Sequence, residues 1–477
     1  MWCSPMRGRP GMRSPSGHGV TGFITAYPIV TFLVACGVVY WWSGGGDGGT
    51  SSTSRQQPPA SDTVVSVTSA AGIPPRCAQR RNRYGLMLDA GSTGSRIHVF
   101  EFDYTDSPRV KLVREVFKEV RPGLSKYGES PKEAADSLRP LMDIAIKEVP
   151  RHLHSCTPVE LKATAGLRLL GQEKSERILT AVESMFRTDF PFSVKEKGAV
   201  IVMDGRDEGP FAWLTINFLL GSLNPKETAP EKTAAIIDMG GASTQIVFVA
   251  GGGGDGEKGA DVMKAAPKEF VYSVSLPTAP SFTYRMYTHS HLGYGLKEAG
   301  KQIMSLERQQ GTTDNALPCQ YEADGKAKAA RFDKCLEIVG TMFPKSKCEY
   351  ETSCSWSNIF QPRLSHWHRG PLFAFSYYFD RLEHFFSEYP DPAKKSIGPE
   401  GGEVTVGFVK TIAQNVCEAI KEPYISHAKG TMCMDLTYLY ALLNVGYQLD
   451  DALPIQVRKK INDVETAWPL GAMILAM

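Results

Sequence analysis

Two stretches of the chain share one pattern, in which an apolar run gives way to a loop of small polar residues and then resumes. The stretches are 84–102, with its loop at 89–96, and 234–249, with its loop at 238–245. Short apolar runs that flank a Gly- and Ser-rich loop are typical of buried strands, so each stretch predicts a β-hairpin. The acids that open the two loops, Asp89 and Asp238, lie 149 residues apart (238 − 89), which is about one domain length.

Both loops have the composition of a phosphate-binding turn. Their sequences are Asp89-Ala-Gly-Ser-Thr-Gly-Ser-Arg96 and Asp238-Met-Gly-Gly-Ala-Ser-Thr-Gln245. Backbone N–H groups and hydroxyls of such a loop suit phosphate oxygens, and the Asp suits a divalent cation, directly or through water. One such loop is as often an ordinary tight turn, but two predict α/β halves that face each other across a cleft and bind one polyphosphate. Neither loop fits the strand–GxxxxGKS/T–helix pattern, so a P-loop NTPase is not expected.

Between the hairpins, two segments place polar residues where a strand ends and a helix begins. In 161–170 the apolar strand stops at Thr164, whose hydroxyl and neighbouring amides suit a phosphate, and Arg168 adds charge or pairs with an acid. Farther on, Glu208 lies at the junction with an apolar helix at 211–220, where the helix dipole favours a negative charge. Taken alone, Glu208 is equally well explained as a structural charge at a helix start.

The N-terminal region predicts a membrane anchor. Residues 23–42 include no charged side chain, and a helix of that length spans about 30 Å, the thickness of a bilayer's hydrocarbon core. Residues 1–22 carry three arginines and no acid, which predicts a cytosolic tail. A cleaved signal peptide is the alternative, since 35–37 are small, but the length and the terminal tryptophan pair favour an uncleaved signal anchor. Residues 43–79, rich in Gly, Ser, Thr and Pro, predict a flexible stalk that holds the rest of the chain outside the cytosol.

Composition and charge narrow the function classes. The 477 residues are 42% hydrophobic and 22% charged, which excludes a wholly disordered or fibrous protein and predicts more than one domain. The 53 basic and 51 acidic side chains leave a formal charge of +2, so we expect no nucleic-acid partner and only a local phosphate site. The chain has 10 cysteines, and on the predicted topology all but Cys3 and Cys36 would face the oxidising side of the membrane. Their irregular spacing lacks the paired CxxC knuckles of a zinc site and predicts structural disulfides.

Five motifs occur in an order that resembles the nucleoside triphosphate diphosphohydrolase family. They are the loops 89–96 and 238–245, Ala163-Thr-Ala-Gly-Leu-Arg-Leu-Leu170, Asp207-Glu-Gly209 with Phe211-Ala-Trp213, and Trp468-Pro-Leu-Gly471. This family comprises the apyrases and Golgi nucleoside diphosphatases, within the actin/Hsp70/sugar-kinase fold superfamily. The resemblance covers 84–477 and implies an α/β fold with two RNase H-like (actin-like) lobes and an interlobe active-site cleft, preceded by the N-terminal transmembrane helix. We expect lobe I at 80–202 and 450–477, and lobe II at 203–449.

The resemblance also implies roles for single residues. The catalytic residues would be Glu208 as general base, Thr164 near the terminal phosphate, and Ser243 and Gln245 positioning the attacking water. Asp89 and Asp238 would hold a Ca²⁺ or Mg²⁺ ion through water. The phosphate-binding residues would be Gly91, Ser92, Thr93, Gly94, Ser95, Arg96, Gly240, Gly241, Ala242, Ser243 and Thr244. Phosphoryl transfer requires such an in-line water, a base to orient it and donors for the developing charge, and no covalent nucleophile.

Residues 287–296 and 373–380 look most like the diphosphatase branch of the Golgi and endoplasmic reticulum. They imply hydrolysis of nucleoside diphosphates, with GDP and UDP favoured, to the monophosphate and phosphate. The enzyme would be a single-pass type II protein of the Golgi or endoplasmic-reticulum membrane, with its catalytic part in the lumen and a secreted form if the stalk is cleaved. The alternatives are a broad-specificity apyrase that also cleaves triphosphates, an exopolyphosphatase or sugar kinase of the same fold, and a catalytically silent nucleotide-binding module.

The resemblance leaves some details to the structure. Tyr377 and Tyr378 are candidates for stacking on the base, with packing in the cleft wall as the alternative. The expected disulfides are Cys319–Cys335, Cys348–Cys354 and Cys417–Cys433, while Cys77 and Cys156 stay unassigned. Pro469 departs from the usual closing motif and is tolerated if it occupies the first turn of the last helix. The Gly-rich insertion at 251–259 is expected to form a surface loop.

Overall fold

The computed structural model describes residues 64–66, 77, 80–105, 110–250, 263–276, 279–309, 317–320, 330–345, 348–350, 354–364, 368–386, 397–418 and 430–477. All of them belong to one compact unit, Pro59–Met477. In these ranges no helix combines the length and apolar character needed to cross a bilayer. The predicted tail at 1–22, the signal anchor at 23–42, nearly all of the stalk and the insertion at 251–259 lie outside the described residues.

The first half of the unit forms a five-stranded sheet in the order β4-β3-β2-β5-β6. Its strands are β2 (Asn82–Ala90), β3 (Ser95–Asp103), β4 (Lys111–Val120), β5 (Val159–Ala163) and β6 (Val200–Val202). β3 pairs antiparallel with both β2 and β4, whereas β2, β5 and β6 run parallel to one another. β2 is buried from Tyr84 onward because both faces of the sheet are covered, as its unbroken apolar run predicts.

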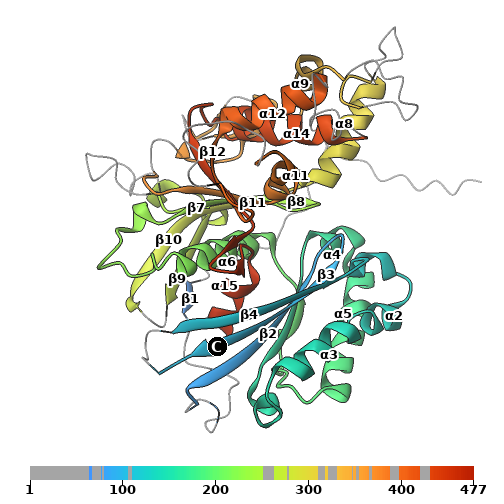
Figure 1. The fold of residues 1–477 in the computed structure, drawn as a ribbon, viewed down its shortest axis with the longest axis vertical. Helices are drawn as coiled ribbons and strands as arrows, with labels where there is room; N and C mark the ends of the chain where they lie inside the picture. The colour runs from blue at the N-terminus through green and yellow to red at the C-terminus, as the bar shows by residue number, and fades with distance from the viewer. Residues whose placement is uncertain are drawn as a thin grey trace, which may run out of the picture. The chain divides into compact units, whose positions relative to one another are not determined.

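Helices cover one face of this sheet (Figure 1). They are α2 (Pro131–Asp136), α3 (Arg139–Glu148), α4 (Ala165–Leu170) and α5 (Gln172–Asp189), with the short turns η1 (Leu124–Tyr127) and η2 (Arg151–Cys156). Leu86 and Leu88 of β2 share a core with Leu141 of α3 and Ile178 of α5. Since side chains alternate along a strand, Met87 points to the opposite face and enters a different core.

The second sheet has eight strands in the order β1-β9-β10-β8-β7-β11-β13-β12. Their bounds are β1 (Val64–Ser66), β7 (Ala235–Met239), β8 (Ser243–Phe248), β9 (Val271–Leu276), β10 (Ala279–Leu292), β11 (Leu372–Ser376), β12 (Gly401–Thr405) and β13 (Pro454–Arg458). A small separate hairpin joins β14 (Lys460–Ile461) to β15 (Val464–Glu465). The run β10-β8-β7-β11-β13 repeats the pattern of the first sheet, an antiparallel trio followed by two parallel partners. This repetition confirms the two α/β halves expected from the repeated hairpins.

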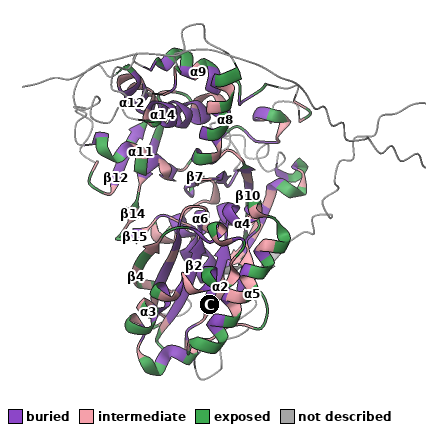
Figure 2. Ribbon diagram, turned by 90° about the vertical axis from the view of Figure 1, so that its right-hand side faces the viewer, coloured by how far each residue is buried: buried purple, intermediate pink, exposed green. Residues whose placement is uncertain are grey.

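One face of the second sheet packs against a layer of helices. They are α8 (Leu296–Gln309), α9 (Phe332–Gly340), α11 (Tyr377–Phe386), α12 (Val406–Glu418) and α14 (Met432–Ala441), which continues into the π-helix η6 (Leu442–Gly446). Three short turns complete the described elements: η3 (Pro230–Lys232), η4 (Lys268–Phe270) and η5 (Trp356–Asn358). Buried residues concentrate in the central strands and on the helix faces that meet them (Figure 2).

Two helices, α6 (Gly205–Leu219) and α15 (Pro469–Ala476), pack against each other, and α6 contacts β7, β8 and β10 of the second sheet while α15 contacts β2 and β3 of the first. Trp213 of α6 and Met473 of α15 belong to one apolar core that includes side chains of both sheets. A side chain at Gly471 would place its Cβ 2.0 Å from the Phe211 carbonyl oxygen, so the two helices approach closely only because this residue is glycine. Pro469 is the first residue of α15, as predicted, where the missing N–H costs no helical hydrogen bond.

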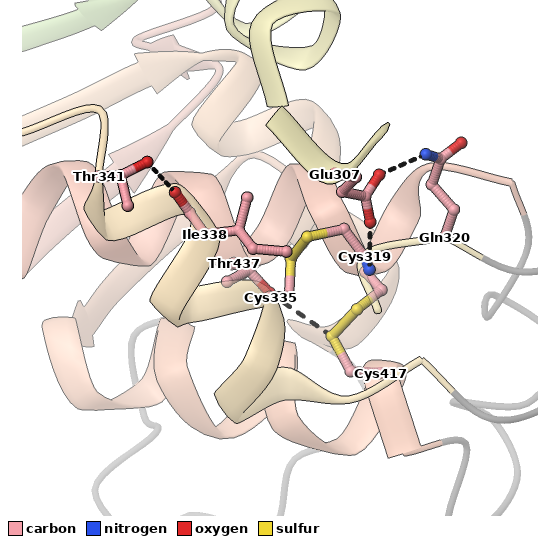
Figure 3. The surroundings of a disulfide bond; sticks show 9 residues. Glu307, Cys319, Gln320, Cys335, Ile338, Thr341, Cys417 and Thr437 are labelled. Carbon is pink, nitrogen blue, oxygen red and sulfur yellow. Dashed lines mark hydrogen bonds between the residues drawn. A yellow bond between two sulfur atoms is a disulfide. The ribbon is translucent and has the colours of Figure 1, made fainter. Parts of the chain in front are cut away.

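The described residues include four disulfides. Three are the expected pairs, Cys319–Cys335, Cys348–Cys354 and Cys417–Cys433, and the fourth joins Cys77 to Cys156, which the sequence left unassigned. Figure 3 shows the first of them beside Glu307, a buried carboxylate near the end of α8. It accepts hydrogen bonds from Cys319 N (2.8 Å) and Gln320 Nε2 (2.5 Å), so the loop that carries the disulfide is fixed to α8.

Candidate active site

Both hairpins border one cavity of about 510 Å³. The first hairpin contributes Gly91, Ser92 and Thr93, and the second contributes Gly240, Gly241, Ala242 and Ser243. Among the other predicted site residues that line the cavity are Asp89, Arg96, Thr164, Glu208 and Asp238. Residues from four separate segments of the sequence therefore meet in one concavity.

The two hairpins have the same turn. In each, the amide two residues after the aspartate donates to a carbonyl three residues farther on: Gly91 N to Gly94 O and Gly240 N to Ser243 O, both at 3.0 Å. The two aspartates consequently occupy equivalent positions at the ends of β2 and β7. This equivalence is what two copies of one phosphate-binding element require.

Helix α8 orients the second hairpin. The N–H groups of Leu296 and Lys297, at the start of the helix, donate to Gly240 O and Gly241 O, both at 2.9 Å. In a planar trans peptide the N–H points opposite to the C=O, so the amides of Gly241 and Ala242 point away from α8. Both residues line the cavity, so these two N–H groups suit phosphate oxygens there.

Glycines allow the neighbouring segments to approach the first hairpin. A Cβ at Gly241 would lie 2.6 Å from Ser92 Oγ, and a Cβ at Gly166 would lie 2.7 Å from Ser92 Cα. Gly166 belongs to the predicted motif 163–170, in which Thr164 N also donates to Ala90 O (3.2 Å). These contacts explain why small residues recur in the motifs, because any larger residue would separate the elements that form the cavity.

Four of the residues predicted to contact phosphate or position the water do not line the cavity: Gly94, Ser95, Thr244 and Gln245. Ser95 is fully buried, and Thr244 Oγ1 donates to Asp238 O (2.8 Å). Side chains alternate along the hairpin strands, so the hydroxyls of Ser95 and Thr244 lie on the side that supports the loops. Ser95 and Thr244 were predicted to contact phosphate, and in the structure their side chains instead support the hairpin loops.

Three buried carboxylates, those of Asp89, Asp238 and Glu208, border the cavity. Burial raises the pKa of Asp238 to about 6; the hydrogen bond from Ser376 Oγ (2.7 Å) opposes this rise and repulsion from Asp89 adds to it. Burial also raises the pKa of Asp89, against the attraction of Arg96 Nη1, which lies 3.2 Å from Asp89 Oδ2. Negative charges that repel one another in a buried site favour a bound cation.

Glu208 lies in the first turn of α6 and forms an ion pair with Arg168 of α4. The distance from Arg168 Nη2 to Glu208 Oε2 is 2.5 Å. Burial raises the pKa of Glu208 to about 7, outweighing the attraction of Arg168. A Cβ at Gly205 would lie 2.3 Å from Arg168 Nη1, so the glycine makes room for the guanidinium. Of the two roles that the sequence left open for Arg168, the structure shows pairing with an acid.

Gln245 reaches the cavity through Ser243. The Gln245 amide donates from Nε2 to Ser243 Oγ (2.8 Å) and to Ser290 Oγ of β10 (3.0 Å). Ser243 lines the cavity and Gln245 lies behind it, so the geometry makes Gln245 a support for the Ser243 hydroxyl. The part in positioning the attacking water that the resemblance implied for Gln245 stays a prediction, and Gln245 would play it through the Ser243 hydroxyl.

The acids suit a cation held through water. In the described part of the chain, no group of three or more His, Cys, Asp or Glu side chains is arranged to bind a metal directly. Asp89 Oδ1 is buried and has no hydrogen-bond partner among the described atoms. A water molecule bound to a cation would satisfy this oxygen, so the residues present fit the predicted ion.

Comparison with known proteins identifies the family. Residues 76–477 match the model of the GDA1/CD39 (nucleoside phosphatase) family. The chain belongs to this family. Ectonucleoside triphosphate diphosphohydrolase 5 of Gallus gallus is 36% identical over 419 residues, which cover 83% of this chain and 88% of the relative. Guanosine-diphosphatase of Schizosaccharomyces pombe is 34% identical over 435 residues, with 82% of this chain and 73% of the relative covered.

Two further comparisons agree with this membership. Nucleoside diphosphate phosphatase ENTPD5 of Homo sapiens is 35% identical over 396 residues, covering 82% of this chain and 86% of the relative. Among solved structures, nucleoside triphosphate hydrolases from Neospora caninum share the fold with a TM-score of 0.54 at 16% identity, covering 84% of this chain and 94% of that one.

In this nucleoside phosphatase, the two predicted base-stacking tyrosines have different environments. Tyr377 lines the cavity, and the guanidinium of Arg381 lies 5.2 Å from the centre of its ring. Tyr378 is fully buried in the core of the second sheet, so its prediction as a base contact is wrong. The two residues begin α11, where successive side chains point in different directions, and only one of them can face the cavity.

Sequence reasoning missed several residues of the nucleoside phosphatase site, among them Ser376, Ser290 and Lys297. Ser376 follows the last buried strand residue before α11 and has a φ of 59°, a conformation that side chains rarely adopt and that often marks functional positions. Its place at the end of a strand parallel to β7 is a signal that sequence reasoning could have used. Ser290 is opposite Gln245 on paired strands, and this register has no local signal.

Proposed function

We propose that this protein hydrolyses nucleoside diphosphates, with GDP and UDP favoured, to the nucleoside monophosphate and phosphate. The observation that carries the proposal is the position of Glu208, a buried carboxylate in a cavity that both phosphate hairpins border. Its pKa of about 7 suits a general base near neutral pH. The names of the relatives, a guanosine-diphosphatase and a nucleoside diphosphate phosphatase, support the choice of substrate class.

In the proposed reaction, the hairpins hold the two phosphates while Glu208 removes a proton from the attacking water. Arg168 keeps the Glu208 carboxylate in position through their ion pair, and the Ser243 hydroxyl orients the water. The water attacks the terminal phosphorus in line with the leaving oxygen, and backbone N–H groups of the hairpins stabilise the charge that develops on the phosphoryl oxygens. Thr164 lies at the start of α4, where it borders the site of the terminal phosphate.

We propose further that Asp89 and Asp238 hold a Ca²⁺ or Mg²⁺ ion through water molecules. The cation would neutralise part of the phosphate charge and the repulsion between the two carboxylates. The unpartnered Asp89 Oδ1 supports this position.

The wider setting is also proposed. The two sheets with their helices form the two lobes, proposed at 80–202 with 450–477 and at 203–449. One strand departs from these bounds, because β13 (Pro454–Arg458), expected in lobe I, pairs within the second sheet. Tyr377 borders the proposed base subsite. Four disulfides support an oxidising compartment, in keeping with a lumenal catalytic unit in the Golgi or endoplasmic reticulum behind an N-terminal signal anchor.

Phosphate release from ADP, GDP, UDP, ATP and UTP, each with Ca²⁺ and with Mg²⁺, tests the substrate class. We expect faster turnover of GDP and UDP than of any triphosphate. Turnover of ATP and UTP as fast as that of GDP and UDP would favour a broad apyrase. Release from none of the five nucleotides, despite their binding, would favour a silent nucleotide-binding module and overturn the proposal.

Replacement of the base tests the mechanism. We expect Glu208→Gln to bind GDP normally and to lose turnover by roughly 10²- to 10⁴-fold, the usual contribution of a general base. The matched control is Asp207→Asn, the neighbouring acid, which does not line the cavity and is expected to keep near-normal turnover. Wild-type turnover by Glu208→Gln would reject the assignment of the base.

A further inference from the structure

The lining of the cavity includes a group of cations in which Lys297 differs from the others. Three arginines that line the cavity each pair with a carboxylate: Arg96 with Asp89 and Glu119, Arg121 with Glu119, and Arg381 with Asp435. The ammonium of Lys459 lies 5.8 Å from the centre of the Phe379 ring. Lys297 has neither kind of partner among the described residues, although it borders the same cavity.

Lys297 also occupies a position that helix electrostatics disfavour. It is the second residue of α8, where the partial positive charge of the helix N-terminus repels a cation. Desolvation, and then repulsion from Arg121, Arg381 and Arg96, lower the pKa of Lys297. A residue that breaks a local rule without a compensating contact in the folded chain is characteristic of functional sites.

The backbone fixes Lys297 to the second phosphate hairpin. Its own N–H donates to Gly241 O, and its Cδ would lie 3.8 Å from a Cβ at Gly241. A Cβ at Gly295 would lie 2.3 Å from Ser243 N, so the turn before α8 is also pressed against this hairpin. The side chain of Lys297 therefore starts beside the loop that is proposed to hold phosphate. The backbone contacts hold the start of α8 close to this loop.

The charges around Lys297 indicate which phosphate it would meet. Apart from Arg168, the charged groups with the largest effects on the pKa of Glu208 are Asp238 and Asp89. After desolvation, the largest effects on the pKa of Lys297 come from arginines, and the only acid among its main influences is Asp435, which is already paired with Arg381. Lys297 and Glu208 thus share none of their main charged influences, which favours a contact of Lys297 with the phosphate attached to the nucleoside over the phosphate that faces Glu208.

We propose that Lys297 binds the α-phosphate of the nucleoside diphosphate and thereby positions the substrate with its β-phosphate toward Glu208. The proposal rests on the proposed function, because it assigns a role within the same site. The anionic phosphate supplies the partner that the folded chain does not provide, and the entropy of ordering the long side chain is offset by a charge-assisted hydrogen bond. Lys297 is in this account a binding and positioning residue, and proton transfer remains with Glu208.

Steady-state kinetics with GDP test the assignment, with inhibition by the two products as the second measurement. GMP keeps only the α-phosphate, whereas inorganic phosphate stands for the β-phosphate. We expect Lys297→Met to raise KM for GDP and the inhibition constant of GMP about tenfold each, the usual effect of losing one charge-assisted contact at a partly exposed site. The inhibition constant of inorganic phosphate should stay unchanged, kcat should fall less than KM rises, and Lys297→Arg should restore most of the affinity.

The matched control is Lys301→Met, one turn farther along α8, where the ammonium pairs with Glu298 at 2.6 Å and does not line the cavity. It should leave all four constants unchanged. The midpoint of thermal unfolding of Lys297→Met without nucleotide should be no lower than that of the wild type, because a cation leaves a helix N-terminus. A lower midpoint, together with equal losses of affinity for GMP and for inorganic phosphate, would show a structural role and overturn the proposal. An unchanged inhibition constant of GMP would also overturn it.

If the wild type itself released no phosphate from GDP, the proposed function would fail instead. Binding of GMP by the wild type and by Lys297→Met would still decide the role of Lys297.

Discussion

The ion pair between Arg168 and Glu208 joins the two motifs that sequence alone could not connect. Burial favours the protonated form of Glu208, repulsion from Asp238 and Asp89 adds to this preference, and Arg168 opposes both. The pKa of about 7 is the balance of these effects. A base of this kind is half ionised near neutral pH, so small changes in its surroundings change the active fraction.

This balance predicts the pH dependence of turnover. In the wild type, kcat should rise with pH through about 7 as Glu208 loses its proton. In Arg168→Met the attraction is removed while burial and repulsion remain, so the pKa of Glu208 should increase and the acidic limb of the profile should move up by about one pH unit or more. The measurement is kcat for GDP between pH 5.5 and 9.5.

Arg139→Met is the control for this experiment, since Arg139 pairs with Asp136 and Asp189 outside the cavity. Its profile should match that of the wild type. An acidic limb that stays in place in Arg168→Met would show that another group governs it.

At the scale of elements, the contact between α6 and α15 depends on the absence of a side chain. Gly471 faces the Phe211 carbonyl so closely that an added Cβ would lie 2.0 Å from its oxygen. A backbone atom cannot move aside as a flexible side chain can, so α15 would have to shift away from α6. Because both helices contribute to the core shared by the two sheets, the shift would loosen that core.

Gly471→Ala should therefore lower the free energy of unfolding by about 2 kcal/mol or more, in the range of overpacked cores. Gly340→Ala is the matched control, because Gly340 ends helix α9 and an added Cβ there would meet no atom within 4 Å. We expect the control to be neutral or slightly stabilising, since alanine is the better helix former. Chemical denaturation of both variants is the measurement, and equal stabilities would contradict the proposed tight contact.

At the scale of the whole molecule, the buried acids of the cavity couple stability to pH and to cations. The pKa of Asp238 is raised to about 6 and that of Glu208 to about 7, so the folded protein holds protons that the unfolded chain has released. Their contribution to stability is therefore fully present below about pH 4 and is lost as pH rises through about 6 to 7. Above that range, the ionised carboxylates repel one another in a buried site.

A divalent cation should reverse this loss, because it binds the ionised carboxylates of the folded protein and not those of the unfolded chain. We expect Ca²⁺ or Mg²⁺ to raise the midpoint of thermal unfolding clearly more at pH 8 than at pH 5, and Asp89→Asn to reduce the effect. Differential scanning calorimetry with and without chelator measures it. An equal increase at both pH values would argue against a cation site formed by these acids.

The local features of the molecule could be predicted from the sequence because they depend on neighbouring residues. The strands on each side of the two Gly- and Ser-rich loops, the glycines within them and the proline at the start of α15 are all encoded within a few positions. The order of five such motifs also identified the family, which the comparison confirms. The boundaries of the two lobes, the signal anchor and the catalytic roles stay predictions.

Only the tertiary structure decided which side chains meet. Arg168 and Glu208 are 40 residues apart, Gln245 and Ser290 45, and Ser376 and Asp238 138, so each contact depends on how strands pair and helices pack. The same packing turned Tyr377 to the cavity and its neighbour Tyr378 into the core, although the sequence treats them alike. Sequence determines local conformation through short-range sterics and hydrogen bonding, whereas the surroundings of a side chain, and with them its charge and its role, exist only once distant segments are packed together.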